Sequence, residues 1–465
     1  MAQATAAARR PGVNIFDESR PLWLIFVIFL VPMMLSNILQ SASQTIGSVF
    51  LGRLIGTDAL AAVSAVFPIV FLLFSFLFGI ASGSSVLIGQ AFGAGDEHKV
   101  KKVAGTVLGA TVAFSIVVAI VGELWSPQML QLLGTPANII AQSDAYTRVI
   151  FLAAPVLFPY LVYTTFLRGI GDAQTPFYFL LLSTLLFVPL MPALILGWWG
   201  LPRLGVVSVA VASLLSQGIT FAALLVRLRL TNHPLQFDME TARDMFATDW
   251  RILWNVLRIG IPTGIQMIML SLSEVAIISF VNHFGSSATA AYGAVNQVVS
   301  YVQFPAISIG ITASIFGAQS IGARREDMLT KVVRTAVGLN YVIGGVIIAV
   351  CYVFAWQIIG WFITDQHTLL IAHTLLMITL WSYLLFGNSS VISGVVRSSG
   401  AVFWPTVNGI FAIWGIEVPA AYLLMRYFGV DGVWMGYPIS FVVVVLLQFF
   451  YYERFWKRRT HARLV

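Results

Sequence analysis

Charged residues are scarce in this sequence. Only 10% of the 465 residues are Asp, Glu, Lys or Arg, whereas 58% are hydrophobic and the mean hydropathy is +0.89. In soluble domains about a quarter of the residues are charged. So few charges cannot cover a surface that faces water, which excludes a soluble globular protein. The composition indicates an integral membrane protein.

Cysteine is almost absent too, because Cys351 is the only one and lies inside an apolar run. A single thiol can form neither an intramolecular disulfide nor a cysteine-based metal site. The six histidines show no ligand spacing, and neither HExxH nor GxSxG occurs. We therefore expect no metal site and no permanently bound cofactor. A membrane-embedded enzyme is kept only as an alternative.

Long apolar runs are abundant. They are about 20 residues or longer, which is the length of a membrane-spanning helix, and lipid requires each helix to satisfy its own backbone hydrogen bonds. We predict an all-α integral membrane protein with 12 transmembrane helices. The runs cover residues 22–47, 59–90, 103–125, 141–167, 176–199, 204–229, 251–282, 288–319, 332–360, 369–394, 405–427 and 430–453.

Basic residues concentrate on one side of these helices. If the N-terminus is cytoplasmic, 22 of the 26 Lys and Arg fall on the cytoplasmic side. The outer loops hold only Arg53, Arg148, Arg203 and Arg426. The positive-inside rule then places both termini in the cytoplasm. The formal charge of +7 thus reflects topology, and no nucleic-acid partner is expected.

The sequence repeats itself at an offset of 229 residues. This shift places GTDALAAVSAV at 56–66 on GSSATAAYGAV at 285–295, and it carries Arg168 and Pro176 onto Arg397 and Pro405. Each half has six spans, an even number, so the two copies share one topology and form parallel lobes. Parallel repeats are a transporter architecture with a binding site between the halves.

The repeat sets the predicted domain boundaries. We expect a cytoplasmic tail at 1–20, a first lobe of helices 1–6 at 21–229, a cytoplasmic linker at 230–250, a second lobe of helices 7–12 at 251–453, and a basic cytoplasmic tail at 454–465. The expected role of the linker is to tether the lobes. In the first lobe, the glycine pairs 79/83 and 105/109 allow close helix approach, for either static packing or sliding.

Two acids lie deep inside apolar runs, far from the ends where the other acids fall. Glu274 is near the middle of the seventh predicted helix, and Glu417 lies in the eleventh, just before Pro419. A charge at the bilayer centre costs about 2.5 to 3.5 kcal/mol, so each acid marks a functional hypothesis. Either acid can instead be a protonated, purely structural hydrogen-bonding group.

Polar side chains recur at helical spacing on three of the predicted helices. The candidates for a coupling-ion or substrate cavity, besides the two acids, are Asn37, Gln40, Gln44, Gln266, Ser273, Asn296 and Gln303. In the 229-residue register Asn37 matches Gln266, which favours one polar cavity between the halves. Buried amides also serve as plain interhelical contacts, worth about 0.6 kcal/mol each on average.

Several stretches together resemble the multidrug and toxic compound extrusion (MATE) transporters. They are VPMMLSNILQSASQTIGSVFLGRLIGTDALAAV, GQAFGAGDEHKVKK, FLRGIGDAQTP and GIPTGIQ, and the match covers nearly the whole chain. The resemblance implies a monomeric 12-helix exporter in the bacterial inner (plasma) membrane that alternates between outward- and inward-facing states. It implies H⁺ or Na⁺ as the coupling ion and amphiphilic organic cations, drugs or metabolites as substrates.

The sequence departs from this family at three acidic positions. Where relatives carry acids on helices one, seven and ten, this chain has Gly47, Leu270 and, approximately, Phe386. Glu274 lies one turn beyond Leu270 on the same helix face. On helix ten, Asn388 is the nearest polar residue and joins the candidates for the cavity.

The mechanism that we expect is direct competition at Glu274. The ionised carboxylate attracts a cationic substrate, and a proton that binds to it removes this attraction. A flippase for lipid-linked precursors stays open as an alternative. Such a protein is expected to have a basic cavity, whereas the interior of the apolar runs contains almost no Lys or Arg.

Overall fold

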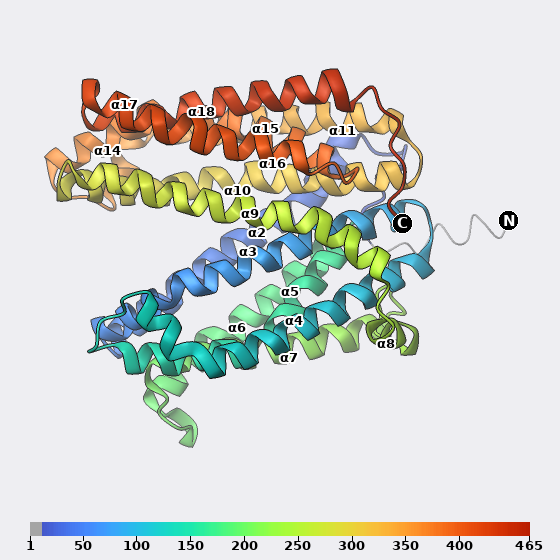
Figure 1. Cartoon of the computed structure of the whole chain (residues 1–465), viewed down its shortest axis with the longest axis horizontal. Coiled ribbons are helices and arrows are strands. Elements are labelled where there is room, and N and C mark those ends of the chain that lie inside the picture. Colours follow the sequence, from blue (N-terminus) through green and yellow to red (C-terminus); the bar gives the residue numbers. More distant parts are fainter. Residues whose placement is uncertain (1–11) are drawn as a thin grey trace. The chain divides into compact units, whose positions relative to one another are not determined.

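The computed structural model describes residues 12–465 of the chain. The first eleven residues of the predicted tail, with Arg9 and Arg10, lie outside the described residues. In the described part, regular structure is helical throughout, and 12 helical stretches are long and apolar enough to cross a membrane. The predicted all-α membrane protein with 12 spans is therefore confirmed (Figure 1).

The chain divides into two compact units. Among the described residues, unit 1 comprises 12–13, Leu35–Gly260 and Val465, and unit 2 comprises Asn14–Met34 and Ile261–Leu464. The two long helices α2 (Leu22–Leu54) and α9 (Trp250–Asn282) each contribute residues to both units. They are therefore the two helices that run from one unit into the other.

Unit 1 contains the remaining helices of the first half. They are α3 (Thr57–Gly93), α4 (Glu97–Leu132), α5 (Ile140–Gly169), α6 (Gln174–Leu196), the short turns η2 (Trp198–Gly200) and η3 (Gly205–Val207), α7 (Ser208–Leu230) and α8 (Met239–Phe246). Helix α5 packs against α3, α4 and α7, so it forms the centre of this unit.

Unit 2 contains the helices of the second half. They are α10 (Ser286–Gly322), α11 (Glu326–Leu339), η4 (Asn340–Gly344), α12 (Gly345–Val353), α13 (Ala355–Gly360), α14 (Gln366–Thr379), η5 (Leu380–Ser382), α15 (Tyr383–Arg397), α16 (Phe403–Ile410), η6 (Phe411–Glu417), α17 (Val418–Phe428), α18 (Val430–Tyr451) and η7 (Tyr452–Trp456). Helix α18 packs against α14, α15 and α17. The segments η4, η6 and η7 are π-helical turns, a form frequent at functional sites.

Several helices extend beyond the apolar runs because polar residues cap them. The carboxylate of Asp96 accepts a hydrogen bond from the backbone N–H of Lys99 at 3.0 Å, so α4 starts six residues before the predicted run. The carboxylate of Asp365 caps α14 in the same way. Such caps satisfy amide groups that a helix start leaves free.

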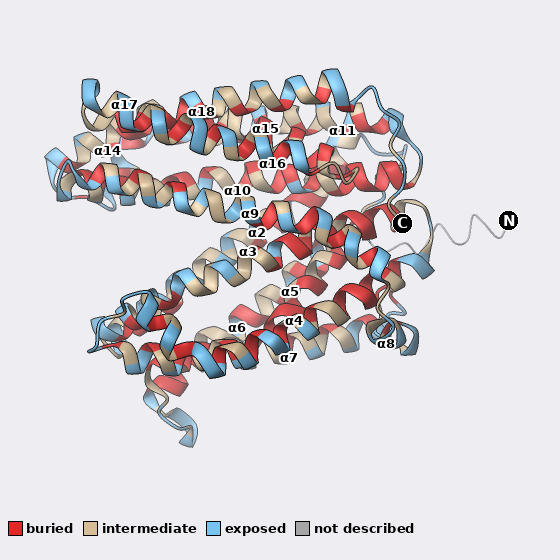
Figure 2. Ribbon diagram, viewed as in Figure 1, coloured by how far each residue is buried: buried red, intermediate tan, exposed pale blue. Residues whose placement is uncertain are grey.

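Large apolar side chains lie both inside the units and on their outer surface. The core of unit 2 includes the fully buried Trp434, whereas Phe67 on α3 is 63% exposed and Ile120 on α4 is 54% exposed. Exposed residues, pale blue in Figure 2, accordingly lie along the lengths of the helices. Apolar residues exposed on a membrane-spanning helix face lipid, so no water-soluble surface is needed there.

The glycine pairs of unit 1 sit where backbones approach most closely. Gly79 and Gly83 face the backbone of α9 at Gly260 and Val256, where an added Cβ would collide with carbonyl oxygens. The pair on α4 instead faces α8, a helix within the predicted linker, which lies beside one end of α4 (Figure 1). Small residues thus position both a spanning helix and the linker helix.

Candidate functional site

Glu274 lies within a cluster of tyrosine hydroxyl groups in unit 2. Its Oε2 atom accepts a hydrogen bond from the Tyr292 hydroxyl at 2.5 Å, and the Tyr437 hydroxyl lies 3.3 Å away. The two hydroxyls are 3.0 Å apart. The three residues come from α9, α10 and α18. A carboxylate inside a spanning segment therefore has two converging phenol donors.

Aromatic packing holds these tyrosines in place. The ring of Tyr292 stacks on Trp434 with ring centroids 5.7 Å apart and an angle of 7° between the planes. Trp434 and Tyr437 are three residues apart on α18, so they project from one face of that helix. Tyr383 of α15 contacts Phe441 of α18 edge-on. Rigid rings with buried hydroxyls orient donors well, because few rotamers are available to them.

Two of the predicted polar residues of α10 take part in the cluster. Tyr292 shares a side-chain hydrogen bond with Asn296, and Tyr383 shares one with Gln303. The tyrosines were missed in the sequence because aromatic residues are common throughout it. One signal was available, since Tyr292 is four residues before Asn296 and continues the polar stripe of that helix.

Glu417 contacts the same strip of α18, the face that carries Tyr437 and Ser440. It is 2% exposed, and its Oε2 atom accepts a hydrogen bond from the Ser440 hydroxyl at 2.9 Å. Ser440 is three residues after Tyr437, so Glu274 and Glu417 contact one face of α18. Glu417 is the last residue of the π-helical turn η6. The structure thus brings the two predicted acids to one helix.

Other predicted residues of unit 2 make separate local contacts. The amide oxygen of Gln266 accepts a hydrogen bond from the guanidinium group of Arg397. The Ser273 hydroxyl donates to the backbone oxygen of Leu270 at 2.7 Å. These side chains connect or stabilise helices in the described structure, and neither is bonded to Glu274.

Asn388 belongs to an amide pair. Its Oδ1 atom accepts a hydrogen bond from Asn340 at 3.0 Å, and its Nδ2 atom donates to the Tyr341 hydroxyl at 2.8 Å. Asn340 also donates to the backbone oxygen of Leu384 at 2.9 Å. Asn340 begins the π-helical turn η4, so this network joins that turn to α15.

The predicted residues of helix one belong to the other unit. Asn37, Gln40 and Gln44 lie in the part of α2 that is grouped with unit 1, and the last two are exposed. Nearby, Gly47 faces the ring of Phe187, and a Cβ added to it would lie 3.5 Å from that ring.

The positions of the two other missing acids differ in environment. Leu270 is 41% exposed, whereas Phe386 packs among Tyr383 and Phe441 with ring centroids 6.2 and 5.4 Å away. An aromatic ring therefore stands beside the tyrosine cluster where relatives are expected to carry the helix-ten acid.

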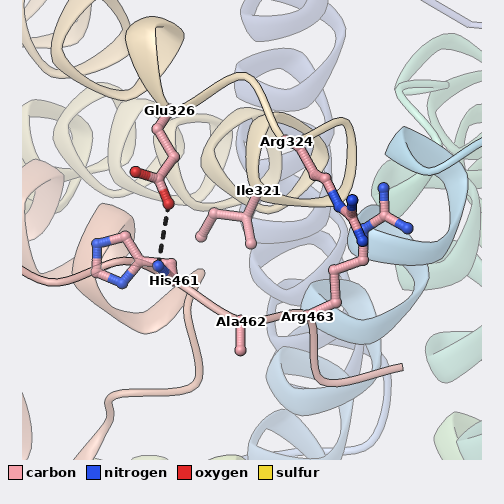
Figure 3. Close-up of a pocket in the computed structure, with 6 residues that line it drawn as sticks. All are labelled: Ile321, Arg324, Glu326, His461, Ala462 and Arg463. Atoms are coloured by element: carbon pink, nitrogen blue, oxygen red, sulfur yellow. Dashed lines mark hydrogen bonds between the residues drawn. The ribbon is translucent and has the colours of Figure 1, made fainter.

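A separate cavity of about 350 Å³ lies at the C-terminal tail of unit 2. It is lined by Ile321, Arg324, Glu326, His461, Ala462 and Arg463 (Figure 3). The backbone N–H of His461 donates to Glu326 at 3.0 Å, and burial lowers the pKa of the His461 imidazole. Two arginines make this cavity unsuitable for a cationic ligand. Among the described residues no group of three His, Cys, Asp or Glu can hold a metal ion.

Comparison with known proteins places these features in a family. The MatE family model matches residues 32–193 and 262–423, two segments that begin 230 residues apart. The probable multidrug resistance protein YoeA of Bacillus subtilis is 53% identical over 451 residues, which is 96% of this chain and 97% of that protein. The multidrug export protein MepA of Staphylococcus aureus is 26% identical over 90% of each chain.

A solved structure shows that the fold is shared. The Vibrio cholerae MATE transporter VcmN in its bent form has a TM-score of 0.83 to this chain at 19% identity, over 92% of this chain and 95% of that one. The twelve helical spans, the match of one family model to both halves, and the identity to YoeA lead to one conclusion. The chain belongs to the MATE family of membrane transporters, and it is not an enzyme.

Proposed function

We propose that this transporter exports amphiphilic organic cations, drugs or metabolites from the cytoplasm in exchange for a cation, H⁺ or Na⁺. The observation that carries the proposal is the Glu274 carboxylate, which lies within a membrane-spanning helix and is bonded to Tyr292. The names of the relatives YoeA and MepA support a drug substrate. The binding of substrate and the binding of the coupling ion both act on the charge of Glu274.

The tyrosine hydroxyl groups stabilise the ionised carboxylate of Glu274 inside the membrane. Hydrogen bonds from Tyr292 and Tyr437 disperse its negative charge, which an apolar environment alone would disfavour. In that state the carboxylate attracts a cationic substrate. When a proton binds, the charge disappears and so does the attraction, which releases the substrate. Exchange then requires no long-range relay.

The geometry favours H⁺ over Na⁺ as the coupling ion. Hard metal cations require several oxygen lone pairs directed at one point. Here the Tyr292 hydroxyl donates to Glu274, and the carboxyl group of Glu417 is bonded to Ser440. A proton needs only one carboxylate oxygen. Glu417 is the second protonatable group along the same strip of α18.

The proposed orientation places both termini in the cytoplasm. The even number of spans requires both ends of the chain on one side, and basic residues concentrate on that side. Within unit 2, Arg325 lies over the ring of Phe16, and His461 bonds to Glu326, so the two ends of the chain meet at one end of the unit. We further propose two parallel six-helix lobes in a monomer of the inner membrane.

Transport by Glu274→Gln in proteoliposomes tests this function. With an imposed pH gradient, the variant should lose substrate–proton exchange and the pH dependence of the remaining transport. Glu123→Gln is the matched control, because Glu123 pairs with Arg148 and has no contact with the tyrosine cluster. A Na⁺ gradient at clamped pH distinguishes the ions. Normal exchange by Glu274→Gln with an unchanged pH profile would refute the assigned role.

A further inference from the structure

Helix α8 lies at the level of the membrane surface. On α4 the last charged residue before the hydrocarbon stretch is Lys102, and residues 103–122 carry no charge. An added Cβ on Gly105 or Gly109 would collide with α8 at Thr241 or Met245. At 1.5 Å per residue these glycines lie about 5 and 10 Å beyond Lys102. Helix α8 therefore packs where headgroups give way to hydrocarbon.

The acids next to α8 all face α4. Asp238, the N-cap of α8, bonds to Lys101 at 2.6 Å, and Asp249 bonds to Lys102 at 2.8 Å. The hydrogen bond from Lys102 lowers the pKa of Asp249. Burial raises the pKa of Asp238, but the hydrogen bonds from Lys101 and Thr241 outweigh it and leave that pKa below its usual value. Both carboxylates are thus ionised at neutral pH and hold the linker against α4.

Two further contacts, both made by Glu240, strengthen this attachment. Glu240, on the first turn of α8, lies 2.5 Å from the imidazole of His98 and 3.4 Å from Lys101. All the acids in these ion pairs therefore belong to the linker, and all the basic partners belong to α4. The side of α8 that faces α4 is fixed by charge as well as by glycine packing.

The opposite side of this segment is apolar and basic. Met239 is 85% exposed and Phe246 is 88% exposed, and they are seven residues apart and so share a face of α8. Arg243 lies between them on that face and is exposed. At the start of α9, Trp250 is 76% exposed and Arg251 is exposed. Neither arginine has an acidic partner within ion-pair distance among the described residues.

We propose that this face of α8 and the start of α9 is a membrane-surface anchor that binds anionic lipids. Met239, Phe246 and Trp250 enter the boundary between headgroups and acyl chains, where amphipathic helices and tryptophan are stabilised. Arg243 and Arg251 bind the lipid phosphates. The occupant is lipid, because α8 lies at the membrane surface and precedes the spanning helix α9 by only three residues.

The anchor makes the position of the linker depend on the charge of the surrounding lipid. Since the inner side of α8 is held by Lys101 and Lys102 of α4, lipid binding on its outer side attaches α4 to the leaflet. Anionic lipid then stabilises the attached linker. Nothing in this step depends on the coupling role of Glu274, so the two proposals can fail independently.

A fluorescent label tests where the outer face of α8 lies. In a Cys351→Ala background the full chain carries no other cysteine, so Phe246→Cys can be labelled alone with an environment-sensitive dye in nanodiscs. The emission should shift to the blue, and lipids with a spin label in the headgroup or upper acyl region should quench it. Met239→Cys should behave in the same way. A label at Thr460→Cys, exposed in the tail, should stay in water.

Lipid charge tests the roles of the arginines. We expect the mole fraction of phosphatidylglycerol that gives half of the emission shift to rise about fivefold for each of Arg243→Gln and Arg251→Gln. Arg53→Gln, at an exposed position of α2, is the control. Water-like emission at residues 246 and 239 would overturn the anchor. Shielding that appears only with two copies per disc would assign the face to a second chain, and equal shifts in neutral lipid would remove the anionic specificity.

Discussion

At the scale of single residues, the site depends on which groups surround one carboxylate. This chain lacks acids at Gly47, Leu270 and Phe386, and its acid on α9 lies one turn further on, at Glu274. That displacement puts the carboxylate within reach of Tyr292 and Tyr437. Phenol donors stabilise the negative charge without adding a competing charge. The same role would otherwise need a basic residue, which would repel a cationic substrate.

The two tyrosines should differ in their effect on transport. Tyr292→Phe removes the 2.5 Å hydrogen bond, whereas Tyr437→Phe removes only the 3.3 Å contact. A hydrogen bond to a charged group contributes about 1.5 to 3 kcal/mol, so we expect Tyr292→Phe to slow exchange roughly 10- to 100-fold. Tyr437→Phe should have a smaller effect. Initial rates in proteoliposomes measure both, and equal rates for the two variants would contradict this order.

At the scale of helices, the repeat is preserved in sequence but used differently in the two units. Gly109 and Gly338 correspond at the 229-residue offset. Gly109 is covered by α8, whereas an added Cβ at Gly338 would meet no atom of the described residues within 4 Å. In the sequence, α8 follows the last spanning helix of the first half, and it packs back against α4. One glycine therefore has a packing role that its counterpart lacks.

This difference predicts unequal costs for the same substitution. Gly109→Leu should displace α8, since the new side chain would collide with the Met245 carbonyl, and overpacking typically costs about 1 to 3 kcal/mol. Gly338→Leu should leave stability nearly unchanged. Thermal unfolding compares the two variants, and trypsin cleavage at Arg243 reports release of α8. Similar melting temperatures and intact linkers in both would show that α8 is not seated on Gly109.

At the scale of the whole molecule, the division into units falls next to two prolines. Unit membership changes between Met34 and Leu35 in α2, and between Gly260 and Ile261 in α9. Pro32 and Pro262 each lie within two residues of the change. Because proline has no backbone N–H, each removes one hydrogen bond of its helix and makes bending easier there.

Bending at Pro262 should therefore matter for turnover. Pro262→Ala restores a helical hydrogen bond, so the expected result is slower exchange with equal or higher thermal stability. Pro305→Ala is the control, because Pro305 lies inside α10 and both flanks belong to unit 2. Exchange rates and melting temperatures are measured together. An unchanged rate for Pro262→Ala would rule out a hinge at this position.

Composition and periodicity alone were sufficient to predict the all-α membrane class, the 12 spans and the candidate acids. These features follow from local rules: the length of an apolar run sets a span, and an acid inside it is conspicuous. The motifs also identified the family. The MatE match and the relatives confirmed it.

Tertiary structure alone decided which side chains meet. Tyr292 and Tyr437 are 145 residues apart, and nothing in the local sequence of either shows that both hydroxyls converge on Glu274. The same holds for the acids beside α8, because only the tertiary structure shows that they pair with Lys101 and Lys102. Local patterns fix what a helix is and which face is polar. Pairing across helices depends on packing of distant segments, which single-residue preferences do not encode.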